Sequence, residues 1–305
     1  MKEKIERLKK ERNAVILAHY YARPEIQDIA DYIGDSLALA QIAAGLDAPV
    51  IVMCGVYFMG ETAKILCPDK TVLIPDMEAG CSLADSCPAA DFEAFIKEHP
   101  NHTVISYVNT SAEVKALSDV LVTSSNARKI VDSFPKDEKI IFGPDRNLGN
   151  YINSITGREM VLWNGACHVH EEFSAEKLAA LKAAHPQAKV LAHPECRKPV
   201  LLLADVVGST AALLKAATEA PDGSEFIVAT ESGILHEMRK LNPTKTFIPA
   251  QPTDSTCGCN DCSFMKLNTL EKLAECLEKM SPAVEVDPEV AAKARKPIER
   301  MLSLS

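Results

Sequence analysis

Three cysteines lie within six positions of the segment TDSTCGCNDCSF, residues 253–264. A compact cluster of this kind is typical of a zinc site or a thiol-redox site, but tetrahedral zinc needs a fourth ligand and the neighbouring residues do not supply one. Two other cysteines stand at matching places in the chain. Cys167 follows Cys81 by 86 residues, and Cys262 follows Cys167 by 95. This spacing indicates one cysteine in each of three repeats.

The chain contains three copies of one strand pattern. An apolar run ends abruptly in polar residues at 14–21, 103–110 and 189–195, and a second short strand follows at 30–36, 118–126 and 204–210. Such apolar runs are typical of buried parallel strands. An aspartate and a hydroxyl recur at the second strand of every copy. The hydroxyls of Ser36, Ser124 and Ser209 come 15, 17 and 16 residues after Tyr21, Tyr107 and His193.

Helical patterns follow these hydroxyls and predict N-cap positions for Ser36, for Ser124 or Ser125, and for Ser209 or Thr210. A third strand then leads into a helix, and a fourth strand ends before a cysteine each time. This alternation predicts an α/β fold of three similar three-layer αβα units with short parallel sheets. We expect the units to span residues 1–80, 81–166 and 167–284, with a helix over 285–305 that packs back on the first.

Ligands bind at the carboxyl ends of parallel strands. An arrangement of the units around a pseudo-threefold axis therefore predicts a central site with three cysteines, three helix N-termini and three polar strand ends. The sequence repeat alone does not distinguish this arrangement from three separate domains in a line. Three thiolates suit a [4Fe–4S] cluster with one open iron, which acts as a Lewis acid. Helix N-termini attract anions, so the expected substrate is a small compound with several negative charges.

The sequence resembles the quinolinate synthase family over essentially the whole chain. The matching motifs are LAHYY, QDIADYIGDSL, YVNTSAEVKALSDV, TSSNA, FGPDRNLG, CHVH, HPEC, ADVVGST and CSFMKLNTL. The resemblance implies the condensation of iminoaspartate with dihydroxyacetone phosphate to quinolinate, phosphate and water in NAD biosynthesis. It also implies a [4Fe–4S] cluster held by three cysteines, three αβα domains around a pseudo-threefold axis, and transient coupling to the L-aspartate oxidase or dehydrogenase that supplies iminoaspartate.

Site residues are carried over from the family at the positions that match its motifs. The implied cluster ligands are Cys81, Cys167 and Cys262, the last because it stands directly before the segment that runs from Ser263 to Leu270. The residues expected to act as acids or bases are Glu195, His19, Tyr21, Tyr107 and His193. Substrate contacts are expected from the same five residues and from Ser36, Val108, Asn109, Ser124, His170, Pro194, Ser209 and Thr210.

The sequence departs from the family in the spacing of its last cysteines. Many relatives have two successive C-x-x-C steps, whereas one residue separates Cys257 from Cys259 here. A regulatory disulfide between Cys259 and Cys262 is an analogy that this spacing weakens. The simplest interpretation of four other cysteines is buried thiols without a chemical role, and four methionines are expected in the core. These residues are Cys54, Cys67, Cys87, Cys196, Met53, Met59, Met77 and Met160.

Composition excludes some classes of protein. The 305 residues carry a formal net charge of -9 and show no basic run with interleaved aromatic residues, which argues against nucleic acid as a partner. No apolar run reaches the roughly 20 residues that span a bilayer, and the first residues form a charged helical pattern, so a cytoplasmic location is expected. Two alternatives stay open: a cluster-dependent hydro-lyase for another dicarboxylate, and a non-catalytic iron–sulfur or redox-sensing protein.

Overall fold

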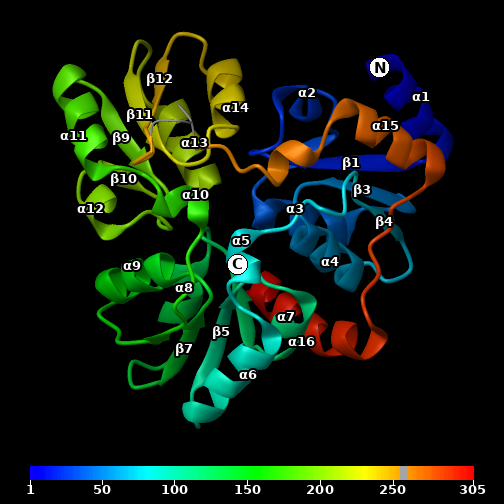
Figure 1. Ribbon diagram of the computed structural model, residues 1–305, viewed down its shortest axis with the longest axis horizontal. Coiled ribbons are helices and arrows are strands. Elements are labelled where there is room, and N and C mark those ends of the chain that lie inside the picture. The colour runs from blue at the N-terminus through cyan, green and yellow to red at the C-terminus, as the bar shows by residue number, and fades with distance from the viewer. Residues whose placement is uncertain (255–259) are drawn as a thin grey trace.

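The computed structural model of the chain describes residues 1–254 and 260–305. Within these residues the strands form three separate four-stranded parallel sheets, in the orders β2-β1-β3-β4, β6-β5-β7-β8 and β10-β9-β11-β12. Figure 1 shows three lobes, one for each sheet, grouped around a common centre. The predicted α/β fold with three parallel sheets is therefore confirmed. The residue boundaries of the three units stay a proposal.

The element bounds follow the predicted repeat. The first unit contains α1 (Lys2–Arg12), β1 (Ala14–His19), α2 (Pro24–Gln27), β2 (Tyr32–Gly34), α3 (Ser36–Gly45), β3 (Val50–Cys54), α4 (Tyr57–Leu66) and β4 (Thr71–Leu73). The second contains α5 (Ser82–Asp85), α6 (Ala89–Glu98), β5 (Thr103–Tyr107), α7 (Ala112–Ala116), β6 (Val120–Val122), α8 (Ala127–Asp132), β7 (Ile140–Gly143), α9 (Arg146–Thr156) and β8 (Val161–Leu162).

The third unit contains α10 (His168–Glu171), α11 (Ala175–Ala184), β9 (Lys189–Ala192), α12 (Lys198–Leu201), β10 (Val206–Val207), α13 (Thr210–Glu219), β11 (Glu225–Ala229), α14 (Ile234–Leu241) and β12 (Thr246–Pro249). A short 3₁₀ helix, η1 (Met265–Leu267), precedes α15 (Leu270–Lys279) and α16 (Pro288–Leu304).

Each sheet is buried on both faces, which produces the three layers. Successive residues of β1 pack into different cores, with Leu17 in one hydrophobic cluster and Ile16 and Ala18 in another. The same alternation separates Leu191 from Val190 in β9. Because side chains alternate across a strand, an unbroken apolar run fills the core on both sides of the sheet.

The repeated aspartate of the sequence pattern has a structural role. In every unit the aspartate follows a short helix, α2, α7 or α12. Its carboxylate accepts a hydrogen bond from the amide of the residue 15 positions earlier, in β1, β5 or β9. All three bonds measure 2.8 Å and join Asp31 to Ile16, Asp119 to Val104 and Asp205 to Val190. These carboxylates fix the entry into the second strand of each sheet.

The two C-terminal helices pack differently from the expected domain division. Helix α15, which the sequence placed in the third unit, packs on α1 of the first, where Leu273 and Leu277 share a hydrophobic cluster with Ile5. Helix α16 contacts α4 of the first unit and also α7 and β6 of the second (Figure 1). It therefore joins two units.

The four cysteines expected as buried thiols are buried. Of the four methionines expected in the core, Met77 is exposed, because it lies in the loop after β4, while the other three are buried. In the part of the chain that the structure describes, no helix is both long and apolar enough to cross a bilayer.

Candidate active site

A cavity, partly open to solvent, lies where the strands of all three sheets end. Most of the predicted site residues line it: His19, Tyr21, Ser36, Tyr107, Asn109, Ser124, His170, His193, Glu195, Thr210, Cys81, Cys167 and Cys262. Three predicted contacts, Val108, Pro194 and Ser209, are not among the described residues that line it. The site thus draws on each unit.

Two of the predicted N-cap positions were wrong. Asp35, not Ser36, caps α3 by accepting a hydrogen bond from Ala38 N, and Asn126, not a serine, precedes α8. Ser209 does cap α13, through a 3.3 Å bond from Ala212 N. The carboxylate of Asp35 takes the amide of Ala38 in the first turn of α3, so this amide is not available to a substrate anion.

Several residues of the cavity were not predicted from the sequence. They are Asp35, Val56, Phe58, Thr123, Val169, Glu231 and Met265. Asp35 directly precedes Ser36, and Glu231 follows the third strand of the third unit, so both lie at strand ends that the repeat marked. Position at a strand end is the signal that could have found them.

The three predicted ligand cysteines occupy equivalent places, because each follows the fourth strand of one unit. Cys81, Cys167 and Cys262 are therefore assigned to the first, second and third unit, although Cys81 and Cys167 stand at the boundaries to the next. The same backbone hydrogen bond occurs in each unit. Its donor is the amide of the third residue after the third strand, and its acceptor is the carbonyl of the residue two positions before the cysteine. These bonds measure 2.7, 2.9 and 3.3 Å and join Tyr57 to Ala79, Arg146 to Gly165 and Ser232 to Asn260. The common backbone pairing supports Cys262 as the counterpart of Cys81 and Cys167. Cys257 and Cys259 lie outside the described residues.

Each of these cysteines begins a turn whose backbone amides point at its sulfur. Hydrogen bonds reach Cys81 from Ala84 and Leu83, Cys167 from His170, and Cys262 from Met265 and Phe264. Burial nevertheless raises the pKa of Cys81 to about 12 and raises the pKa values of Cys167 and Cys262. The thiols are therefore protonated without metal, and binding a metal group as thiolates releases protons.

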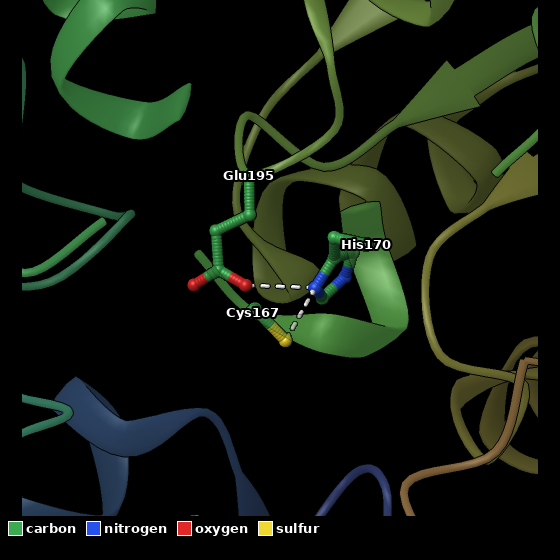
Figure 2. A group of neighbouring side chains, drawn as sticks. All are labelled: Cys167, His170 and Glu195. Atoms are coloured by element: carbon green, nitrogen blue, oxygen red, sulfur yellow. Dashed lines mark hydrogen bonds and ion pairs between the residues drawn. The ribbon is translucent and has the colours of Figure 1, made fainter. Parts of the chain in front are cut away.

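Cys167, His170 and Glu195 place a sulfur, a nitrogen and an oxygen within 4.8 Å of one another (Figure 2). The His170 Nδ1 atom lies 2.7 Å from Glu195 Oε2 and 3.3 Å from Cys167 Sγ. The short distance is that of a charge-assisted hydrogen bond, with Nδ1–H donating to the carboxylate. Hydrogen bonding therefore accounts for this group without a metal ion.

A chain of hydrogen bonds connects Tyr21 to Glu195. Thr230 Oγ1 lies 2.7 Å from the Tyr21 hydroxyl and 2.9 Å from His170 Nε2. With its hydrogen on Nδ1, directed at Glu195, His170 accepts at Nε2 from Thr230, and Thr230 in turn accepts from Tyr21. Thr210 lies 2.8 Å from the same Tyr21 hydroxyl and donates to it in this arrangement. The donors all point toward the carboxylate.

Glu195 is the acceptor at the end of this chain and is 3% exposed. Burial alone would raise its pKa, but the contact with His170 and the hydrogen bonds from His170 and Tyr107 lower the pKa of Glu195 below its usual value. The carboxylate is ionised at neutral pH. Burial also raises the pKa of Tyr107 and Tyr21 well above the usual value, so both phenols are protonated.

His19 and His193 both present Nε2 to the cavity, because a backbone amide occupies Nδ1 of each ring. The Nδ1 atom of each accepts from the amide two residues on, from Tyr21 at 3.1 Å and from Glu195 at 3.4 Å. Burial lowers the pKa of His19 to about 4 and that of His193 to about 3, so both rings are neutral. A neutral ring that accepts at Nδ1 carries its hydrogen on Nε2, and His193 donates it to Ser124 at 3.1 Å.

The fold and the cavity together define an α/β protein with an enzyme-like site between three parallel-sheet units, lined by three cysteines from equivalent positions. The model of a family described as Quinolinate synthetase A protein matches residues 3–303, and the chain belongs to this family. Relatives named quinolinate synthase are 59% identical over 301 residues in Thermosynechococcus vestitus and in Synechocystis, and 58% identical over 303 residues in Chloroherpeton thalassium. Each alignment covers 99% of this chain and 94% of the relative.

Membership of this family implies an iron–sulfur cofactor. The donor set of the cavity fits such a group, because three thiols from equivalent positions line it and backbone amides already point at each sulfur. Asn109 also fits a ligand-binding cavity. Its Oδ1 atom is buried and has no hydrogen-bond partner within the described ranges.

Proposed function

We propose that the chain condenses iminoaspartate with dihydroxyacetone phosphate to give quinolinate, inorganic phosphate and water, in NAD biosynthesis. The observation that carries this proposal is the meeting of three equivalent cysteines with imidazole, phenol, hydroxyl and carboxylate groups in one cavity. A non-catalytic iron–sulfur protein would not need this second set of groups. A cytoplasmic location and transient coupling to the enzyme that supplies iminoaspartate remain expectations from the sequence and the family.

Cys81, Cys167 and Cys262 are the residues proposed to hold a [4Fe–4S] cluster. Bound by three thiolates, such a cluster would supply a Lewis acid at the iron that has no cysteine ligand. The backbone hydrogen bonds to the three sulfurs support their thiolate forms, because a hydrogen bond to the charged form stabilises it.

Neutral hydrogen-bond donors are proposed to bind the carboxylates and the phosphate of the substrates. The hydroxyls of Ser36, Ser124 and Thr210 line the cavity beside His19 and His193, each with a hydrogen on Nε2. The amide oxygen of Asn109, which has no partner in the described part of the chain, is suited to an N–H or O–H of the substrate. Such groups orient anions without adding cations to the cavity.

Tyr21 and Glu195 are proposed to move protons during enolisation, imine formation and dehydration. The ionised Glu195 can take a proton from a substrate carbon or oxygen, and the protonated phenol of Tyr21 can donate one to a substrate oxygen, while the hydrogen bonds through Thr230 and His170 hold the two groups in place. General bases of this kind contribute about a hundredfold to ten-thousandfold to turnover.

The direct test is an anaerobic assay. Protein reconstituted with iron and sulfide is mixed with iminoaspartate and dihydroxyacetone phosphate, and quinolinate is measured by chromatography. We expect quinolinate and phosphate in equal amounts. The same preparation mixed with hydroxy-dicarboxylates tests for a hydro-lyase; dehydration of those compounds with no quinolinate formed would overturn the proposal.

A further inference from the structure

Asp145 is a fully buried acidic side chain that the proposed proton transfers do not use, and burial with the nearby Glu195 raises its pKa well above the usual value. It lies two residues after β7, and its two oxygens accept from different backbone amides. Oδ1 accepts from Leu148 N at 2.7 Å, in the first turn of α9, and Oδ2 accepts from Cys167 N at 3.1 Å. One side chain therefore connects the start of this helix to the cysteine of the second unit.

Glu231 makes the same connection in the third unit. It lies two residues after β11 and is fully buried. Oε1 accepts from Cys262 N at 2.9 Å, and Oε2 accepts from Gly233 N at 2.7 Å, just before α14. Lys266 Nζ lies 2.8 Å from Oε1 and donates to the carbonyl of Tyr21 at 2.8 Å. This network also ties the loop that carries Cys262 to the first unit.

The first unit keeps the backbone pairing but has no such carboxylate. Val56 stands two residues after β3, at the position equivalent to Asp145 and Glu231, while Tyr57 N still donates to Ala79 O. Within the described ranges no carboxylate accepts from the amide of Cys81. The three cysteine positions are thus alike in backbone but differ in how firmly the side chains fix them.

We propose that Asp145 and Glu231 are positioning residues that hold Cys167 and Cys262, each within its own unit, ready to bind the metal group. The proposal rests on the ligand roles proposed above for the two cysteines. An amide side chain at either position replaces one acceptor oxygen with an NH₂ group that cannot accept, so one backbone N–H loses its partner. An unpaired buried donor of this kind favours local opening by about tenfold or more.

Asp119 and Asp205 provide matched controls in the same two units. Each accepts a 2.8 Å hydrogen bond from a strand amide, as Asp145 and Glu231 accept from backbone amides near the cysteines. The controls lie at the opposite end of the sheet from the cysteines. The variants are Asp145→Asn and Glu231→Gln, with Asp119→Asn and Asp205→Asn beside them. The readout is the alkylation rate of individual cysteines by iodoacetamide in iron-free full-length protein, followed by peptide mass spectrometry.

We expect Asp145→Asn to raise the alkylation rate of Cys167 by about tenfold and leave Cys262 near its wild-type rate, and Glu231→Gln to do the reverse. The control variants Asp119→Asn and Asp205→Asn should leave the alkylation rates of both cysteines within about twofold of the wild-type rates. In cluster-loaded protein, both test variants should also lose iron faster to a ferrous chelator, seen as bleaching of the visible absorbance. If the amide variants do not fold, Asp145→Glu and Glu231→Asp, which keep two oxygens but displace them, should give the same unit-specific pattern.

Equal increases at both cysteines in either variant, or no increase at all, would overturn the proposal, because they would mean general loosening or no anchoring. The alkylation pattern needs no cluster. It therefore separates a failure of this inference from a failure of the ligand assignment, which iron measurements on cysteine variants test independently.

Discussion

The carboxylate of Glu195 lies 2.7 Å from Nδ1 of His170, and both side chains are almost fully buried. The two residues come from different elements, since Glu195 follows β9 and His170 belongs to α10. Their contact leaves Glu195 ionised inside the protein and orients His170 so that Nε2 faces Thr230. This pair therefore holds the carboxylate that is proposed to take a proton from the substrate.

Replacing Glu195 with Gln should lower turnover by about a hundredfold or more, because the amide can accept a hydrogen bond but cannot take the proton. Iron content and substrate affinity should stay near the wild-type values. Turnover, iron per chain and affinity are measured in one preparation. Wild-type turnover would remove the role as a base, and loss of iron would assign Glu195 to the support of the metal group.

Thr230→Val should lower turnover by about tenfold to a hundredfold, because it keeps the size of the side chain but breaks the connection between Tyr21 and His170. Thr230→Ser restores the hydroxyl and should recover most of the rate. Steady-state kinetics with iron determination checks both variants. Equal rates for the valine and serine variants would show that the hydroxyl plays no part.

Buried His19 should make the iron-free protein less stable in mild acid. Its folded pKa of about 4 lies below the ordinary value of 6.5, so between these pH values the unfolded chain binds a proton that the folded chain does not. Stability falls as pH decreases through this window, by about 2 kcal/mol from pH 7 to pH 5 for this residue. Urea unfolding at the two pH values should show a smaller loss for His19→Gln; an equal loss would contradict the assignment.

Asp119→Ala should cost about 1 kcal/mol of unfolding free energy, because the amide of Val104 loses its 2.8 Å hydrogen bond at the start of β5, an inner strand of the second sheet. The residue is remote from the cavity lining, so turnover should not change. Urea unfolding beside an activity assay checks this. A large loss of activity at unchanged stability would mean that the repeated aspartate serves the site and not the strand.

The sequence predicted the three sheets well because each copy of the repeat shows its own apolar runs and polar strand ends. The residues it missed depend on contacts between segments far apart in the chain. Thr230 gains a role only because Tyr21 and His170 approach it from two other elements. The packing of α15 on α1 likewise depends on an apolar surface of the first unit that no other element covers. The periodicity of the α15 sequence shows that the helix has an apolar face but not which unit that face contacts.

Local rules also failed where two neighbouring residues compete for one position. Asp35 and Ser36 can both cap a helix, and the carboxylate takes that position while Ser36 becomes the first residue of α3. The choice of Cys262 among the last three cysteines came from the family's motif. The backbone pairing of Asn260 with Ser232 adds an independent structural reason for it.

The central claim is that one cysteine from each unit binds the metal group, and iron content of single cysteine variants tests it most directly. Anaerobically reconstituted wild-type protein should contain about four irons and four sulfides per chain. Cys81→Ala, Cys167→Ala and Cys262→Ala should each lose the cluster and quinolinate formation together, whereas Cys257→Ala should keep both. A Cys262→Ala variant that retains its iron while Cys257→Ala loses it would contradict the account.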